Sequence, residues 1–211
     1  MVMLHNDPRT RGLVAAETAE LSERCLSGGD RWLAASARHA ASRAVWLALE
    51  RRLLPGIVQH FAHRKRWIER RCRAAIADGF TRVIVLGAGF DALGTRLGLE
   101  NDHIEVIEVD HPATQAAKRA AIESFASHPL QFIACDLGRD DLPASLMNDT
   151  RKTVVIAEGL LMYLAEPIVL RLFDQVHALS PAGVQFIFSH LVSWPNGRAG
   201  LRPCSRVIDA W

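Results

Sequence analysis

The pattern of apolar and polar positions changes near residue 79. Before that point, apolar residues recur at the three- and four-residue spacing of amphipathic helices, and no run has the character of a strand. After it, short apolar, β-branched runs alternate with helical patterns, which predicts repeated βαβ units. The predicted strands span residues 82–88, 104–110, 130–137, 153–158 and 184–191. We therefore predict an α/β protein with a Rossmann-like open, mostly parallel sheet and helices on both faces.

The two patterns also predict the domain organisation. Residues 1–79 are expected to form an N-terminal helical cap, and residues 80–211 a Rossmann-like cofactor-binding domain. Three helices are predicted in the cap, over residues 13–26, 31–54 and 55–78. Few residues follow the last predicted strand. We expect the sheet to be incomplete at this edge, or a second copy of the chain to pair there in a homodimer.

A buried strand runs directly into a glycine turn. Val83–Leu86 is wholly apolar, and Gly87 and Gly89 lack the β-carbons that would prevent a tight turn and close approach to a ligand. Strand, glycine turn and helix in this order form the nucleotide-binding corner of an open α/β sheet. The turn also fits the looser dinucleotide pattern G-x-G-x-x-A, with Asp110 near the distance expected for a ribose contact. An NAD(P)-dependent oxidoreductase is therefore one alternative.

Acidic side chains follow four of the predicted strands. They are Asp91, Asp110 with Glu108 two residues before it, Asp136 and Glu158. Because the carboxyl ends of parallel strands meet at one edge of a sheet, we expect these acids to converge on one crevice. Like charges would repel a pyrophosphate there. S-adenosylmethionine has no phosphate and carries a sulfonium and an ammonium cation, so the acids favour this cofactor.

Five sequence blocks together resemble the leucine carboxyl methyltransferase family, including its bacterial members, within the class I S-adenosylmethionine-dependent methyltransferases. They are residues 62–69, 86–91 with 96–97, 108–112 with 118–119, 136–137 and 157–164. The resemblance implies O-methylation of a carboxylate or hydroxyl on a small molecule. Position 93 is leucine where many bacterial relatives have arginine. Members of the family also continue with further strands, so a truncated, non-catalytic cofactor-binding remnant is a second alternative.

The resemblance further implies a role for each matched position. The implied cofactor-binding residues are Arg64, Gly87, Gly89, Asp91, Asp110, Asp136, Leu137 and Glu158. Asp110 would bind the ribose hydroxyls, and Asp136 and Leu137 would contact the adenine. Glu158 would face the methionine ammonium. Arg64, on the helix before the first strand, would pair with the cofactor carboxylate, for which a guanidinium is well suited.

Candidates for the chemistry itself are few. Tyr163, the single tyrosine, follows the fourth predicted strand and is our candidate for contact with the methyl acceptor; the alternative is a packing residue at a helix start. His190 is a weaker candidate for a general base. His60 and His63 are three residues apart with no third ligand of suitable spacing nearby, so no metal site is predicted. We assign no catalytic residue.

Composition and charge bear on the expected partners and cellular location of the protein. A net charge of +2 gives no reason to expect a nucleic-acid partner, and no apolar run approaches the length of a membrane span. The four cysteines lie far apart without a CxxC pair, and no signal-peptide pattern precedes them. Reduced thiols in the cytoplasm are therefore expected. The expected ligands are S-adenosylmethionine and a small-molecule methyl acceptor, with no nucleic acid and no membrane.

Overall fold

The computed structural model describes residues 5–6, 16–24, 31–122 and 130–191. The chain divides into two compact units. The first, which we call the helical unit, comprises residues 1–67 and 191–211, and the second, the sheet unit, is Ile68–His190. Helix α5 (Ile57–Ala77) contributes residues to both units. It ends at a glycine, Gly79, whose φ of 87° suits the left-handed C-cap position.

The described part of the helical unit contains short helices. They are α2 (Ala16–Arg24), α3 (Arg31–Arg38) and α4 (Ala40–Leu53), followed by the first half of α5. The prediction of one continuous helix over residues 31–54 is wrong, because His39 has an extended backbone with φ −85° and ψ 134°. Trp46 Nε1 donates to Ser36 Oγ at 3.0 Å and links the two helices across this break.

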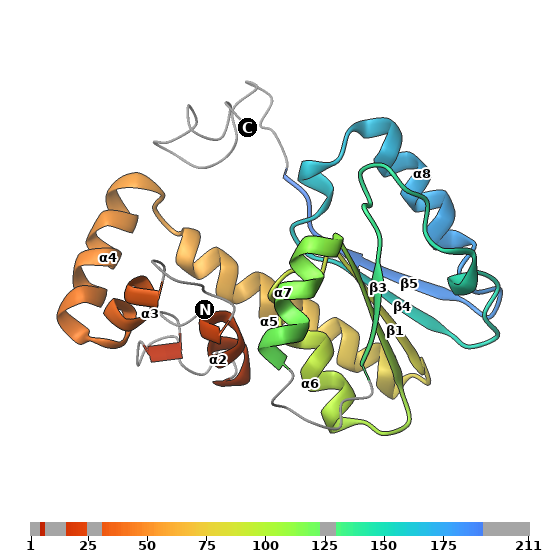
Figure 1. Ribbon diagram of the computed structural model, residues 1–211, viewed down its shortest axis with the longest axis horizontal. Coiled ribbons are helices and arrows are strands. Elements are labelled where there is room, and N and C mark those ends of the chain that lie inside the picture. The colour runs from red at the N-terminus through yellow and green to blue at the C-terminus, as the bar shows by residue number, and fades with distance from the viewer. Residues whose placement is uncertain (1–4, 7–15, 25–30, 123–129, 192–211) are drawn as a thin grey trace. The chain divides into compact units, whose positions relative to one another are not determined.

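The sheet unit contains five parallel strands in the order β3-β2-β1-β4-β5 (Figure 1). The strands are β1 (Arg82–Leu86), β2 (Glu105–Asp110), β3 (Leu130–Ala134), β4 (Thr153–Ala157) and β5 (Val184–Phe188). Each lies within the range predicted from the sequence. The strand order reverses between β1 and β4, so the switch point where open α/β sheets bind ligands lies at the carboxyl ends of these two strands.

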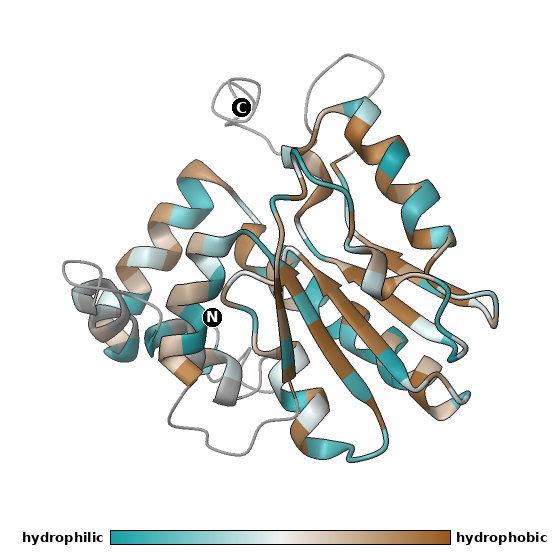
Figure 2. Cartoon of the chain, turned by 45° about the vertical axis from the view of Figure 1, so that its right-hand side comes forward, coloured by the Kyte–Doolittle hydropathy of each residue, from teal (hydrophilic) through white to brown (hydrophobic). Residues whose placement is uncertain are grey.

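Burial explains why these segments form strands. Every residue of β1 and of β4 is buried, as expected for central parallel strands covered on both faces. Figure 2 shows the strands as mostly hydrophobic ribbons. The two outer strands are less buried, since β3 and β5 each contain partly exposed residues. β5 pairs with β4 and, within the described residues, with no other strand. The predicted homodimer contact along the outer edge of β5 stays a prediction.

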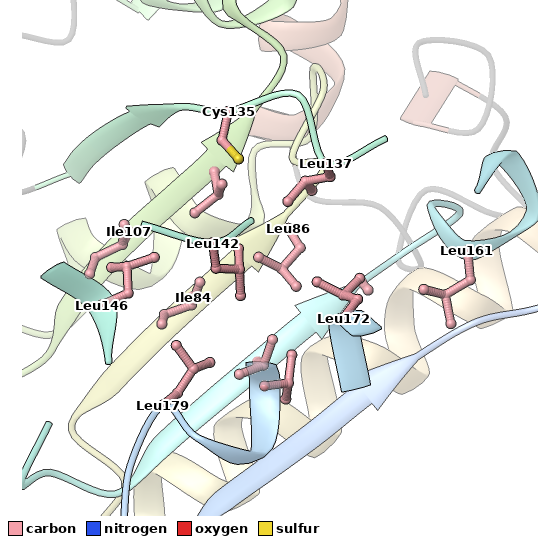
Figure 3. Close-up of a cluster of buried hydrophobic side chains, with 14 residues drawn as sticks. Ile84, Leu86, Ile107, Cys135, Leu137, Leu142, Leu146, Leu161, Leu172 and Leu179 are labelled. Atoms are coloured by element: carbon pink, nitrogen blue, oxygen red, sulfur yellow. The ribbon is translucent and has the colours of Figure 1, made fainter. Parts of the chain in front are cut away.

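Helices cover both faces of the sheet, which confirms the predicted fold class. Helix α8 (Glu166–His177) packs on one face, and α6 (Leu93–Glu100) and α7 (Pro112–Ile122) pack on the other (Figure 1). On the α8 side, fourteen buried side chains form one hydrophobic cluster, with Ile84, Ile107 and Val155 from the strands and Leu172 and Leu179 from the α8 segment. Figure 3 shows how closely these side chains interleave.

A buried arginine lies at the amino ends of the strands. Arg82, at the start of β1, is only 2% exposed, and its Nη1 donates to the Leu146 carbonyl at 2.9 Å. Its Nε lies 3.3 Å from Glu105 Oε2 and 3.6 Å from Asp149 Oδ2. Three oxygens, one from β2 and two from the segment before β4, thus compensate the buried guanidinium, as a charge removed from water requires. This cluster lies at the edge of the sheet opposite the glycine turn.

None of the helices within the described ranges is both long enough and apolar enough to cross a bilayer.

Candidate functional site

The glycine turn is held between the loops that follow its two neighbouring strands. Gly87 and Gly89 have φ values of 61° and 51°, in the left-handed region where side chains are disfavoured. Gly87 N donates to the Val109 carbonyl at 2.8 Å, which ties the turn to β2. A β-carbon at Gly87 would lie 2.9 Å from Leu160 Cδ1 in the loop after β4. The structure therefore brings the ends of β1, β2 and β4 together at the switch point.

Asp110 is placed at this turn, as the sequence predicts. Its Oδ2 accepts a hydrogen bond from Gly89 N at 2.6 Å, and its Oδ1 accepts one from His111 N at 2.7 Å. An ionised carboxylate offers about four acceptor positions. Asp110 therefore has capacity left for hydroxyl donors, while its backbone contacts fix its orientation beside the glycines.

Asp91 and Asp136 each bond to the backbone of their own loop. Asp91 Oδ1 accepts from Leu93 N at 3.2 Å, which forms an Asx turn just before α6. Asp136 Oδ1 accepts from Gly138 N at 3.0 Å. The peptide N–H just before Asp136 donates to the Asp110 carbonyl at 2.9 Å, so the loop after β3 begins beside β2. The roles of both acids toward a cofactor stay predictions.

The loop that carries Glu158 is tied to the end of β5. Gly159 N donates to Ser189 Oγ at 2.8 Å, and Ser189 N donates to the Ala157 carbonyl at 3.1 Å. Ser189 thus orients the loop in which Glu158 lies. Sequence reasoning missed this serine. The available signal was a small hydroxyl residue directly after a strand, at the edge where ligands bind.

The surroundings of three further candidates, Tyr163, Leu137 and Arg64, differ from one another. Tyr163 is 64% exposed, so it is not a core packing residue. Leu137 is buried in the cluster beneath α8, and its predicted adenine contact stays a prediction. Arg64 lies in the helical unit, with its guanidinium 4.8 Å from the centre of the Phe61 ring, and its pairing with a cofactor carboxylate likewise stays a prediction.

Glu108 does not join the crevice, contrary to the prediction from its place near the end of β2. The side chain is 1% exposed, and its Oε2 lies 2.6 Å from Lys118 Nζ on α7. The reason is that α6 and α7 cover the sheet at this level, whereas Asp110 lies beyond them at the strand end. Burial raises the pKa of Glu108 to about 7, although the Lys118 ammonium acts in the opposite direction.

In the described part of the chain, no three His, Cys, Asp or Glu side chains are grouped so that they could hold a metal ion.

Residues 2–177 match the family described as leucine carboxyl methyltransferase. The chain belongs to this family. That assignment confirms the resemblance to the class I S-adenosylmethionine-dependent methyltransferases and speaks against the nicotinamide alternative.

Relatives and solved structures agree with this assignment. A Mycobacterium bovis BCG protein, provisionally named an S-adenosyl-L-methionine-dependent methyltransferase, is 35% identical over 169 residues, covering 75% of this chain and 52% of the relative. A Mycolicibacterium gilvum protein of the same provisional name is 32% identical, covering 85% of this chain and 57% of the relative. The solved structure named StiE O-MT superposes with a TM-score of 0.53 at 13% identity, covering 79% of this chain and 52% of that one. It shows the fold alone.

This chain spans about half the length of the curated relatives that it matches. The names of those relatives support S-adenosylmethionine as the cofactor. The residues at the switch point fit this molecule, because two glycines permit close backbone approach and Asp110 retains free acceptor positions for hydroxyl groups.

Proposed function

We propose that this chain binds S-adenosylmethionine at the carboxyl ends of β1, β2 and β4 and transfers its methyl group to an oxygen of a small molecule. The observation that carries the proposal is the contact between Asp110 and Gly89, which joins an acidic acceptor to a glycine turn at the switch point. Glu158, in the loop after β4, adds a further carboxylate for a cationic ligand. The carboxyl or hydroxyl nature of the acceptor oxygen follows from the family resemblance.

The bound cofactor supplies a methyl group already activated by the sulfonium, so the protein's task is to position the acceptor and exclude water. Alignment of this kind can contribute about 7–11 kcal/mol toward the barrier. Tyr163 is exposed beside the loop after β4 and is the residue we propose for contact with the acceptor. A carboxylate acceptor needs no base, whereas a hydroxyl acceptor would lose a proton, for which His190 is the candidate.

Calorimetric titration tests the cofactor. S-adenosylmethionine should bind the chain, and NADH should not. Asp110→Ala should weaken S-adenosylmethionine binding by about 10- to 100-fold, because a hydrogen bond to a charged group contributes about 1.5–3 kcal/mol. Asp149→Ala is the matched control, since it removes an acid at the opposite edge of the sheet and should leave the affinity unchanged. Equal affinity of wild type and Asp110→Ala would refute the proposed site.

A transfer assay with S-adenosylmethionine labelled in its methyl group tests the chemistry. Pools of small carboxylic acids and of phenols or alcohols serve as acceptors. A labelled methyl ester releases methanol in mild base, whereas a methyl ether does not, so base treatment separates the two products. Binding of the cofactor without transfer to either pool would favour the alternative of a non-catalytic cofactor-binding chain.

A further inference from the structure

A buried lysine on α7 connects β2 with the turn that follows β1. Lys118 is 1% exposed on the inner face of α7, and its ammonium lies 2.6 Å from Glu108 Oε2 on β2. The same ammonium donates to the backbone carbonyl of Asp91, in the turn between β1 and α6. Lys118 thus links α7, β2 and the turn that leads into α6.

This arrangement is poorly suited to stabilising the fold. Removing an ammonium and a carboxylate from water costs several kcal/mol per ion, and apolar residues of similar size often serve equally well. Burial also raises the pKa of Glu108 to about 7, with the Lys118 ammonium opposing that rise and the nearby carboxylates of Asp91 and Asp110 adding to it. Across the sheet, Glu108 pairs with Val85 on β1 and Phe132 on β3, which carry no charge. A buried pair that is this costly to ionise calls for a function beyond packing.

The backbone segment that Lys118 holds contains two glycines. Gly87 and Gly89 make the turn conformationally permissive. Other hydrogen bonds of the turn run from Gly87 N to the Val109 carbonyl, from Gly89 N to Asp110 Oδ2, from Asp91 N to the Ala88 carbonyl and from Leu93 N to Asp91 Oδ1. Lys118 adds a side-chain contact from α7 at the distal end of the turn, where α6 begins.

We propose that Lys118, held by Glu108, is a positioning residue that fixes the Asp91 turn in the conformation that binds the cofactor. The proposal rests on the proposed binding of S-adenosylmethionine. Lys118 is not expected to contact the cofactor, since its ammonium lies beneath the turn and already contacts Glu108 and the Asp91 carbonyl. The turn binds well because it is already ordered, and an ordered site avoids the cost of ordering on binding.

The test compares two buried cations at opposite edges of the same sheet. Lys118→Met and Arg82→Met each remove one buried cation from an ion cluster, and both should lower the unfolding midpoint in urea. Only Lys118→Met should weaken S-adenosylmethionine binding, by about 10-fold. Only Lys118→Met should accelerate hydrogen exchange of the Gly89 and Leu93 amides in the ligand-free protein.

A double variant separates positioning from stability. Glu108→Leu with Lys118→Met removes both charges together, so the unfolding midpoint should recover much of what Lys118→Met loses. Affinity should stay low, because the Asp91 carbonyl still lacks its donor. Affinity that recovers together with stability would overturn the proposal, as would equal losses of affinity in Lys118→Met and Arg82→Met. Absence of S-adenosylmethionine binding in the wild type would instead refute the proposed function.

Discussion

Gly94→Ala in helix α6 should destabilise the protein, against the usual effect of this substitution. Gly94 lies in the first turn of α6, and alanine in place of glycine inside a helix ordinarily stabilises by about 0.5–1 kcal/mol. Here the added β-carbon would lie 2.6 Å from Glu108 Oε1, well inside van der Waals contact. Glu108 cannot move away, because it is 1% exposed and paired with Lys118.

The magnitude follows from weighing these two effects. Overpacking a closed site typically costs about 1–3 kcal/mol, which exceeds the gain in helix propensity. We therefore expect Gly94→Ala to lower the free energy of unfolding by about 1–2 kcal/mol. Urea unfolding measures this as a lower midpoint with an unchanged slope. A variant more stable than the wild type by about 1 kcal/mol would refute the close seating of α6 on Glu108.

The matched control removes the obstacle instead of the glycine. In a background of Glu108→Ala with Lys118→Met, the space below α6 is open, and Gly94→Ala should become neutral or stabilising. The difference between the two backgrounds should exceed about 1 kcal/mol, as expected for residues in contact. Additive effects would show that the cost of Gly94→Ala arises elsewhere.

Two further predictions concern the loop after β4 and the acid-sensitive cluster at the amino end of the strands. Ser189→Ala leaves Gly159 N without its acceptor, so the free energy of unfolding should fall by about 1 kcal/mol and S-adenosylmethionine should bind several-fold more weakly in calorimetry. A hydrogen bond from Arg151 holds the pKa of Asp149 well below its usual range. The resulting stability is present at neutral pH and lost as the pH falls below about 4, a loss that Asp149→Asn should lack in urea unfolding measured from about pH 6 to pH 3.

The sequence predicts the strands well because their apolar runs have no alternative environment. A segment such as Val83–Leu86 must be covered on both faces, and only the interior of a layered sheet provides that. The break at His39 could not be predicted in the same way. Its neighbours all tolerate helix, and no proline or glycine marks the position, so the extended backbone at His39 depends on tertiary context.

The expectation that acids near the ends of strands face the glycine turn holds for Asp110 and fails for Glu108. Asp110 is the last residue of β2, and its carboxylate contacts the glycine turn as predicted. Glu108 has the same charge and lies only two residues earlier, yet helices cover it. The sequence does contain a signal for the burial of Glu108. Its partner Lys118 lies between Gln115 and Ile122 on the buried face of α7. A lysine on a buried helix face predicts a buried acid opposite it.

The acids proposed to bind a cationic cofactor, Asp91, Asp110, Asp136 and Glu158, must also be accommodated in the protein without one. Three of these carboxylates are stabilised by the backbone around them. Asp91, Asp110 and Asp136 each accept hydrogen bonds from backbone N–H groups of the loops they border. Such bonds offset part of the repulsion between neighbouring acids. The same bonds fix the orientation of the carboxylates. These three carboxylates are therefore oriented by the folded loops before any ligand binds, as the proposed binding of a cationic cofactor requires.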